Sequence, residues 1–549
     1  MQQINLITRR GFMDQSMKMG LAAALSTLVD IPFVIKSALA AGNNIGANGK
    51  KMLFIFLRGA NDGLNSIIPA GDKTIYDLVR PNIKVPVNPA NFSTLGQCDF
   101  PTSGSGATFG YAEALHTGNG FAGLHPSLKF LAPVYNAGDL ALIHRVGYPR
   151  QSRSHFDSQN YWENGNPNNN LVKDGMLYRT MIESGLANTA PLTGVSVQSA
   201  LPLILRGSAA AMTNLTDPTR NNLFGIPNDS AGNLKADAAL RNAMGGEFSD
   251  KKNRELLKLQ FENLNNTLSL LDPAMFSDTA NTFVDNEATD GDFPYFLFPT
   301  TNAKNGGYTR PGGGTDNGKY VVDTGAYGFF SNLKAAAIIL NKTDAIVAGT
   351  EFGGFDTHQT QGSATGAHAN LQRRIGWAMY ALRKYFSGSY SDRCAWNNLV
   401  VVTLSEFGRT TVENGDMGTD HAEAGPMFVA GGAVKGYGKA GVTTSVYGCG
   451  SGDTYNGQNV GWVNGSNYNA TAGTGSGTMF GVSSRYLKRC IDYRSVLGKV
   501  IRDHLGATQD QLNRIIPGYT VTGERLQSGG VTSGPGTDGT TIAGELPIV

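Results

Sequence analysis

Residues 398–404 read NLVVVTL and are followed at once by SEFGR, residues 405–409. A short, unbroken run of branched apolar residues is typical of a strand that is buried on both faces, as strands of parallel sheets are. The polar residues after it indicate a turn at the carboxyl end of that strand. Two similar runs lie far away in the chain, KMLFIFL at Lys51–Leu57 and DLALIHRV at Asp139–Val146. Together they predict a largely parallel, buried sheet.

Helical patterns alternate with these strands. Apolar residues recur every three or four positions from Ala367 to Phe386, as on one face of a helix. Further strands are predicted at Ala345–Gly349 and Pro426–Gly431, and further helices at Leu128–Asn136, Ser154–Glu163, Tyr327–Leu340 and Tyr493–His504. Repeated strand, turn and helix predict an α/β fold, a doubly wound and mostly parallel sheet with long loop insertions.

The domain boundaries are predicted from the part of the chain in which strands and helices alternate. We expect a leader at residues 1–40 and one α/β domain at residues 41–520. The domain carries an insertion at about residues 164–320, within which Leu256–Leu271 has helical spacing. Residues 521–549 are rich in Gly and Thr and are expected to form a tail.

The leader resembles a twin-arginine signal peptide. Thr8–Met13 reads TRRGFM, a weakly apolar stretch runs from Met19 to Val29, and Ala38-Leu39-Ala40 has the small residues that signal peptidase requires. The twin-arginine translocase and signal peptidase are therefore the expected partners, and the bacterial periplasm or the exterior the expected location. The apolar stretch is too short to span a bilayer, and no later stretch approaches about 18 apolar residues. We therefore expect no stable transmembrane anchor.

The composition narrows the function classes. The chain carries 45 basic and 43 acidic residues, and without residues 1–40 it carries 41 of each. A neutral body without basic runs argues against nucleic acid as a partner. The four cysteines, Cys98, Cys394, Cys449 and Cys490, lack CxxC spacing, which argues against a zinc knuckle and leaves any disulfide pairing open.

Polar clusters lie next to the predicted strands. They are RGANDGLN around Asp62, SRSHFD around Ser154 and His155, FDTH with Asp356 and His358, SEFGR with Glu406 and Arg409, and GTDH with His421. In an open α/β sheet such loops meet in one crevice. Asp, Glu and His are ligands of divalent cations, and a serine at a helix start lies in the favourable field of the helix N-terminus.

These motifs resemble a known family. RGANDGLN, SRSHFDSQ, GGFDTHQTQ, SEFGRTTVENG and GTDHAEAGPMFVAGG, in this order from about Lys51 to Gly506, are similar to the uncharacterised domain family numbered 1501. That family is a twin-arginine-exported branch related to alkaline phosphatases and sulfatases. The resemblance implies an alkaline-phosphatase-like sheet and a metal-dependent hydrolase of small anionic esters, phosphate more readily than sulfate.

The resemblance also assigns roles. Asp356, His358 and His421 would hold one divalent metal ion, and Asp62 and Glu406 a second. Ser154 would be the nucleophile, with Ser152 as the fallback, or a metal-bound water would attack instead. Two further residues are catalytic candidates: Arg409 would clamp an anionic group, and His155 would contact substrate or form a local ion pair.

The sequence departs from the phosphatase pattern. Asp356-x-His358 is shorter than the phosphatase Asp-x-x-x-His, and Phe407 stands where phosphatases have a histidine. The second site is therefore rich in oxygen, which suits Mg, Mn or Ca better than Zn. These departures leave open whether the chain binds two ions or one, or has lost the site. No Cys/Ser-x-Pro-x-Arg motif is present, so formylglycine sulfatase chemistry is not expected.

Simpler interpretations stand beside these roles. Ser154 could be only a helix N-cap, and Asp62 only a turn residue. Asp420 could orient His421 or be a solvated acid. At the level of function, the alternative is a non-catalytic exported protein for binding or assembly that keeps the fold and a structural metal.

Overall fold

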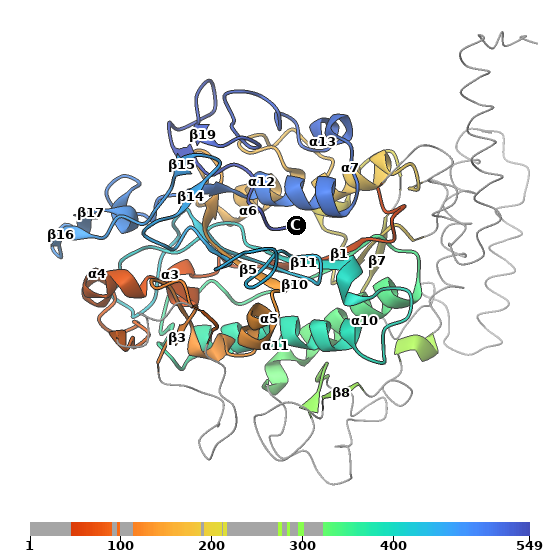
Figure 1. Ribbon diagram of the computed structural model, residues 1–549, viewed down its shortest axis with the longest axis horizontal. Coiled ribbons are helices and arrows are strands. Elements are labelled where there is room, and N and C mark those ends of the chain that lie inside the picture. The colour runs from red at the N-terminus through yellow and green to blue at the C-terminus, as the bar shows by residue number, and fades with distance from the viewer. Residues whose placement is uncertain are drawn as a thin grey trace, which may run out of the picture.

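A computed structural model describes residues 45–89, 96–98, 113–187, 192–210, 212–216, 273–276, 283–285, 295–300 and 322–549 (Figure 1). The expected leader at residues 1–40 and the helical pattern at Leu256–Leu271 lie outside these residues.

A nine-stranded sheet runs through the centre of the described structure, in the order β13-β5-β12-β11-β1-β10-β6-β7, with β18 also paired to β5. The strands are β1 Lys51–Leu57, β5 Leu140–Gly147, β6 Gly194–Val197, β7 Thr213–Leu215, β10 Val347–Phe352, β11 Leu399–Leu404, β12 Gly425–Ala430, β13 Val446–Tyr447 and β18 Ile491–Asp492. The three apolar runs of the sequence became β1, β5 and β11. β1 is parallel to both of its neighbours, β10 and β11. The prediction of an α/β fold with a mostly parallel sheet is confirmed.

One strand runs against the others. β12 is antiparallel to β11 and to β5, which the sequence pattern did not reveal. The start of β12 therefore lies at the edge of the sheet where the parallel strands end. This explains how His421, which precedes β12, meets Asp356, which follows β10.

Side chains of β1 alternate between two apolar cores. Leu53 and Ile55 belong to one core, whereas Met52 and Phe54 belong to the other. Helices cover both faces, with α10 and α11 on one side of the sheet and α12 and α13 on the other (Figure 1). The α-helices among the described residues are α3 Gly63–Ser66, α4 Lys73–Val79, α5 Leu131–Asn136, α6 His155–Asn164, α7 Met176–Glu183, α10 Tyr327–Lys342, α11 Ala367–Ser387, α12 Tyr493–Lys499 and α13 Gln509–Ile515. Those labelled α5, α6, α10, α11 and α12 match predicted helices, with shifts at their ends, and the other four were not predicted.

Two segments expected outside the regular fold pack against it. Within the range expected as an insertion, at about residues 164–320, β6 and β7 extend the central sheet beside β10. The expected C-terminal tail packs onto the second core, where Ile542, Leu546 and Ile548 are buried. A few apolar residues spaced among Gly and Thr are enough to fix this segment, although its composition is typical of a loop.

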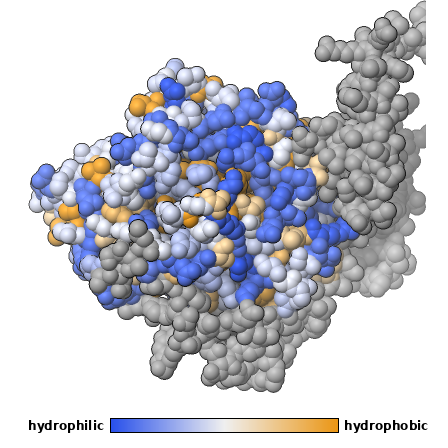
Figure 2. Space-filling view, in the orientation of Figure 1, coloured by the Kyte–Doolittle hydropathy of each residue, from blue (hydrophilic) through white to orange (hydrophobic). Residues whose placement is uncertain are grey.

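The surface is mostly hydrophilic on the face in view, with apolar residues scattered in small patches (Figure 2). Within the described ranges, no helix is both long enough and apolar enough to cross a bilayer.

Candidate metal centre

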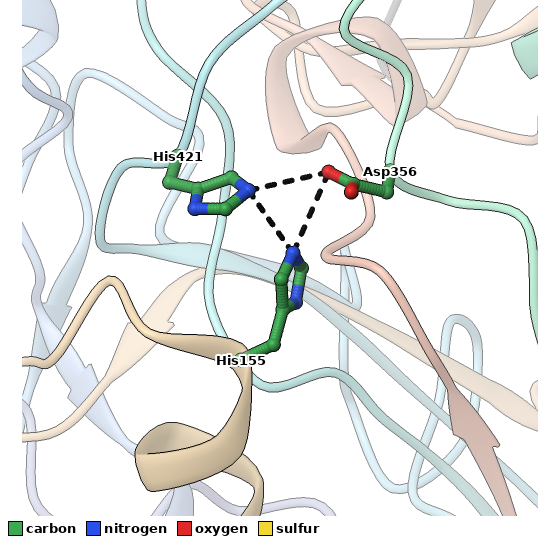
Figure 3. A group of neighbouring side chains, drawn as sticks. All are labelled: His155, Asp356 and His421. Carbon is green, nitrogen blue, oxygen red and sulfur yellow. Dashed lines mark hydrogen bonds and ion pairs between the residues drawn. The ribbon is translucent and has the colours of Figure 1, made fainter.

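Three side chains converge at the carboxyl edge of the sheet (Figure 3). His155 is the first residue of α6, Asp356 lies in the loop after β10, and His421 lies in the loop before β12. His155 Nε2 is 3.0 Å from His421 Nε2 and 3.5 Å from Asp356 Oδ1. His421 Nε2 is 3.2 Å from the same oxygen. One ligand atom from each residue therefore faces a common point.

His358 borders this group. Its Nε2 lies 3.0 Å from His421 Nε2 and 3.0 Å from Asp356 Oδ1, so it touches two of the three ligand atoms. His358 is thus placed as a further ligand or as a proton carrier beside an ion held by His155, Asp356 and His421.

The other ring nitrogen of each histidine is already engaged. Nδ1 of His155 lies 2.9 Å from Glu406 Oε1, and Nδ1 of His358 lies 3.1 Å from Asp420 Oδ1. Nδ1 of His421 lies 2.9 Å from the carbonyl oxygen of Arg153. Each Nδ1 faces an oxygen that can only accept a hydrogen bond, so in the neutral ring the proton belongs on Nδ1.

This tautomer leaves three Nε2 lone pairs and a carboxylate oxygen facing one another. Acceptors at such distances repel unless a cation lies between them. Ligand atoms about 2.0–2.1 Å from a tetrahedral ion lie roughly 3.3 Å apart, close to the distances found here. The residues fit a divalent ion, and the nitrogen-rich set favours zinc over magnesium or calcium. The sequence analysis assigns one ion to Asp356, His358 and His421, and only its expected second site, with Asp62 and Glu406, is rich in oxygen.

Asp356 is held as an anion by Arg409. Burial acts to raise the pKa of Asp356, but the hydrogen bond and charge of Arg409 outweigh it and hold the pKa at about 2. The Arg409 guanidinium also donates to the carbonyl oxygens of Gly59, Ala60 and Thr419. Its side chain is fully buried. The structure therefore places Arg409 beneath the site, where it positions Asp356, and not at the surface where it would meet an anion.

Glu406 supports His155. It is fully buried, and its Oε1 accepts hydrogen bonds from the Gly59 amide at 2.8 Å and from Gln159 Nε2 at 3.1 Å as well as facing His155. Burial acts to raise the pKa of Glu406, yet the hydrogen bond from His155 lowers it overall. The same hydrogen bond is the main cause that raises the pKa of His155. Glu406 thus orients a candidate ligand, whereas the sequence predicted it to be a ligand itself.

Asp62 is not brought into this group. Its two oxygens accept from Arg80 at 2.6 and 3.0 Å, and Oδ2 also accepts from Gln361 at 2.6 Å. Burial acts to raise the pKa of Asp62, and Arg80 outweighs burial so that the pKa falls. The second metal site expected from Asp62 and Glu406 is therefore not assembled by the described side chains.

Ser154 is the N-cap of α6. Its hydroxyl accepts from the amide of Asp157 at 3.4 Å, a long hydrogen bond, and its own amide donates to Ser152 Oγ. This is the simpler of the two interpretations that the sequence left open. Its position directly before His155 also keeps it next to the cluster.

Sequence reasoning missed three features. His155 was expected to contact substrate or to form a local ion pair. It pairs with Glu406 and Asp356, and it also lies in the cluster, which was not expected. A signal for this exists, since His155 and Gln159 are spaced by four residues and share the face of α6 that meets Glu406. Asp420 was considered as a partner of His421, but it pairs with His358. Arg80, the partner of Asp62, carries no motif, so no sequence signal could have found it.

The fold and these contacts define a class, an α/β protein with a histidine-rich candidate metal centre at the carboxyl edge of its sheet. A family model described as "Protein of unknown function (DUF1501)" matches residues 301–449, which supports the resemblance to that family. The matched range contains Asp356, His358, Glu406 and His421. No curated protein and no solved structure matches the chain.

Proposed function

We propose that this chain is an exported, metal-dependent hydrolase of phosphate esters, and less readily of sulfate esters, on an alkaline-phosphatase-like sheet. One observation carries the proposal. Nε2 of His155, Nε2 of His421 and Oδ1 of Asp356 lie within 4.8 Å of one another, while the opposite ring nitrogens are held by fixed acceptors. Such an arrangement costs free energy without a cation and is preorganised for one.

The exposure of the cluster favours catalysis over a structural metal. Structural zinc sites are closed, with four protein ligands, whereas catalytic sites keep a position open. The side chains of His155 and His421 are 24% and 28% exposed, and that of Asp356 is 47% exposed. A substrate could reach an ion at this exposed site directly. A protein that only binds or assembles would not need its metal to be accessible.

A bound zinc ion would act as a Lewis acid on the ester oxygen and lower the pKa of a nearby water or hydroxyl. The residues of the chain supply the rest. Asp356 stays anionic because of Arg409, and Glu406 keeps His155 in the required tautomer. His358, oriented by Asp420, can hold or pass a proton at Nε2.

Ser154 is the candidate nucleophile, with water as the alternative. The N-terminus of α6 favours an anion at this position, because its first amides carry partial positive charge. The hydroxyl already caps the helix, but the 3.4 Å distance indicates a weak bond that it could leave.

The test begins with metal analysis of protein exported in its native form. We expect about one zinc or similar ion per chain, and turnover of an aryl phosphate or a phosphodiester in a panel that also holds an aryl sulfate. Bound metal with no turnover of any ester, across several divalent ions, would favour the binding or assembly role. Absence of metal from every preparation would contradict both the hydrolase role and the binding or assembly role with a structural metal.

Export is tested separately. Arg9→Lys combined with Arg10→Lys should keep the protein in the cytoplasm with its leader uncut, because the translocase reads the arginine pair. Normal processing of this double variant would exclude the twin-arginine route. A single Lys18→Ala change is the control and should be processed normally.

A further inference from the structure

A second feature lies at the same edge of the sheet, a cavity of about 370 Å³ at the ends of β6 and β10. Its polar lining consists of Gln198, Ser199, Asn332, Glu351 and Arg374, and the side chains of Phe329 and Phe352 form an apolar part. The two rings are stacked with centroids 4.5 Å apart. This volume lies in the range of small-molecule sites.

The cavity adjoins the candidate metal centre. Gly353 lines it, and Asp356 follows three residues later, so the two are at most about 11 Å apart along the chain. Gly353 and Gly354 are exposed and carry no side chain. A Cβ at Gly353 would meet nothing within 4 Å. Gly353 and Gly354 thus expose bare backbone between the cavity lining and Asp356 along the chain, over which one ligand could extend.

Two polar atoms beside the cavity have no partner among the described residues. Gln198 is 4% exposed, and its buried Oε1 accepts no hydrogen bond within the described part of the chain. The Nε–H of Arg374 likewise donates to no acceptor within that part of the chain. A buried amide or guanidinium group without a partner is costly. Both atoms are closed to solvent, so a ligand that offers a donor and an acceptor satisfies them only when the side chains of Gln198 and Arg374 turn toward the cavity.

The charges around the cavity are already paired. Arg374 Nη2 bonds both oxygens of Asp323, at 2.6 and 2.9 Å. Glu351 accepts from Arg58 Nε at 3.1 Å, and Arg58 also bonds Glu163 of α6. A charged ligand would have to compete with these ion pairs, whereas a neutral one need not. Amides, a hydroxyl and an aromatic wall suit vicinal hydroxyls on a ring with an apolar face.

We propose that this cavity binds the neutral, polyhydroxylated part of the substrate, a sugar unit whose ester group reaches the metal centre across Gly353. The link to catalysis rests on the proposed function, but binding of the sugar unit in the cavity does not.

Binding is measured first, by saturation-transfer NMR with methyl hexosides (glucoside, galactoside and mannoside) as probes. Wild type and the metal-site variant Asp356→Ala should both bind at least one of them. Gly353→Leu, which places a side chain in open space over the cavity, should abolish the signal. Gly452→Leu is the matched control, since its Cβ also meets nothing within 4 Å and it lies in the loop after β13, away from the cavity lining.

Turnover is measured next, as the ratio of kcat/KM for a hexose 6-phosphate to that for an aryl phosphate. Gln198→Ala should lower this ratio about tenfold, because a hydrogen bond to the sugar is lost. If no ester is turned over but a hexoside binds and Gly353→Leu blocks it, the cavity assignment stands while the hydrolase proposal fails. Absence of hexoside binding, or binding that Gly353→Leu and Gln198→Ala leave unchanged, would overturn the assignment.

Discussion

Two groups of histidines lie near each other in this protein and behave in opposite ways. The first group faces solvent in part and consists of His155, His358 and His421. The second group is completely buried and consists of His125, His144 and His368. Burial is the main cause that lowers the pKa of the second group, to about 3, 3 and 4 respectively.

The difference lies in which nitrogen faces which partner. Nδ1 of His125 and of His144 accepts a hydrogen bond from a backbone amide, so these lone pairs are satisfied within the fold. In the first group each Nδ1 faces an acceptor, and the Nε2 lone pairs are left to face one another. His368 differs from both patterns, because its Nε2 lies 3.2 Å from Asn61 Oδ1 and its Nδ1 has no partner among the described residues. The partners of the two ring nitrogens, more than the identity of the residue, therefore distinguish the candidate metal ligands from His125 and His144.

The largest expected effect lies in the buried region. Arg80→Met leaves Asp62 buried without a counter-ion and should lower the free energy of unfolding by about 3–5 kcal/mol. Denaturant unfolding measures it, and the metal content of the folded protein should stay at the wild-type value. Arg393→Met removes an exposed pair with Asp344 and should cost less than about 1 kcal/mol. Equal losses in both variants would contradict a buried pair at Asp62.

Next come the candidate ligands. Asp356→Ala and His421→Ala should each lose the metal while the fold survives, because both side chains lie on loops. Metal at about 100 times its dissociation constant should stabilise wild type by about 2.7 kcal/mol and these variants hardly at all. Elemental analysis and thermal unfolding with and without metal give the answer. Asp416→Ala, in the same loop as His421, is the control, and unchanged metal content in the two ligand variants would refute the site.

The third prediction concerns how the stability of the fold depends on pH through the buried histidines His125, His144 and His368. The unfolded state protonates its histidines near pH 6.5, whereas the buried group takes up protons only near pH 3–4. Stability from these rings is therefore complete above pH 6.5 and is lost as the pH falls toward 4. Between pH 7.5 and 5 the loss should be about 2 kcal/mol for each ring. Unfolding is followed in the presence of a chelator, and equal stability at the two pH values would show that these rings titrate in the fold as they do in the unfolded chain.

Fourth are the residues that orient the ligands. Glu406→Gln and Asp420→Asn should weaken metal binding about 10–100-fold, because each removes the charge that fixes a histidine tautomer. Competition with a chelator of known affinity measures the change. Asp62→Asn is the contrast in the buried region and should leave the affinity of the folded protein unchanged. Loss of metal in Asp62→Asn would restore the two-ion site that the sequence suggested.

The smallest effect is expected at Ser154. Ser154→Ala should cost about 0.5–1 kcal/mol, the low end for an N-cap, since the hydrogen bond is long. Ser154→Asp should keep the stability, because aspartate also caps a helix. Once a substrate is known, turnover of Ser154→Ala and of Ser152→Ala decides the nucleophile, and full turnover in both would assign the attack to water. A stability loss well above this range would mean that Ser154 does more than cap α6.

Much of this architecture is predictable from the pattern of apolar residues within short segments of the sequence. Continuous apolar runs predicted β1, β5 and β11, because such runs are stable only when both faces are covered. Together with the strand predicted at Ala345–Gly349, they placed Asp356 and Glu406 near the same edge of the sheet. The direction of β12 was not predictable, since a six-residue apolar strand has no marker of direction. The roles within the site depend on contacts between distant segments, such as Arg80 with Asp62 and Arg409 with Asp356. No spacing in the chain encodes those contacts.

The central position of β1 has a consequence for the order of events during synthesis. Met52 pairs with Val347 on one side and with Val400 on the other, so β1 emerges from the ribosome about 300 residues before either neighbour exists. At a synthesis rate of roughly 5–20 residues per second, the apolar KMLFIFL segment stays without its partner strands for between about 15 and 70 seconds. During that time it is an unpaired apolar segment that is prone to aggregate. The sheet closes only near the end of translation, which is compatible with the proposed export of the folded chain.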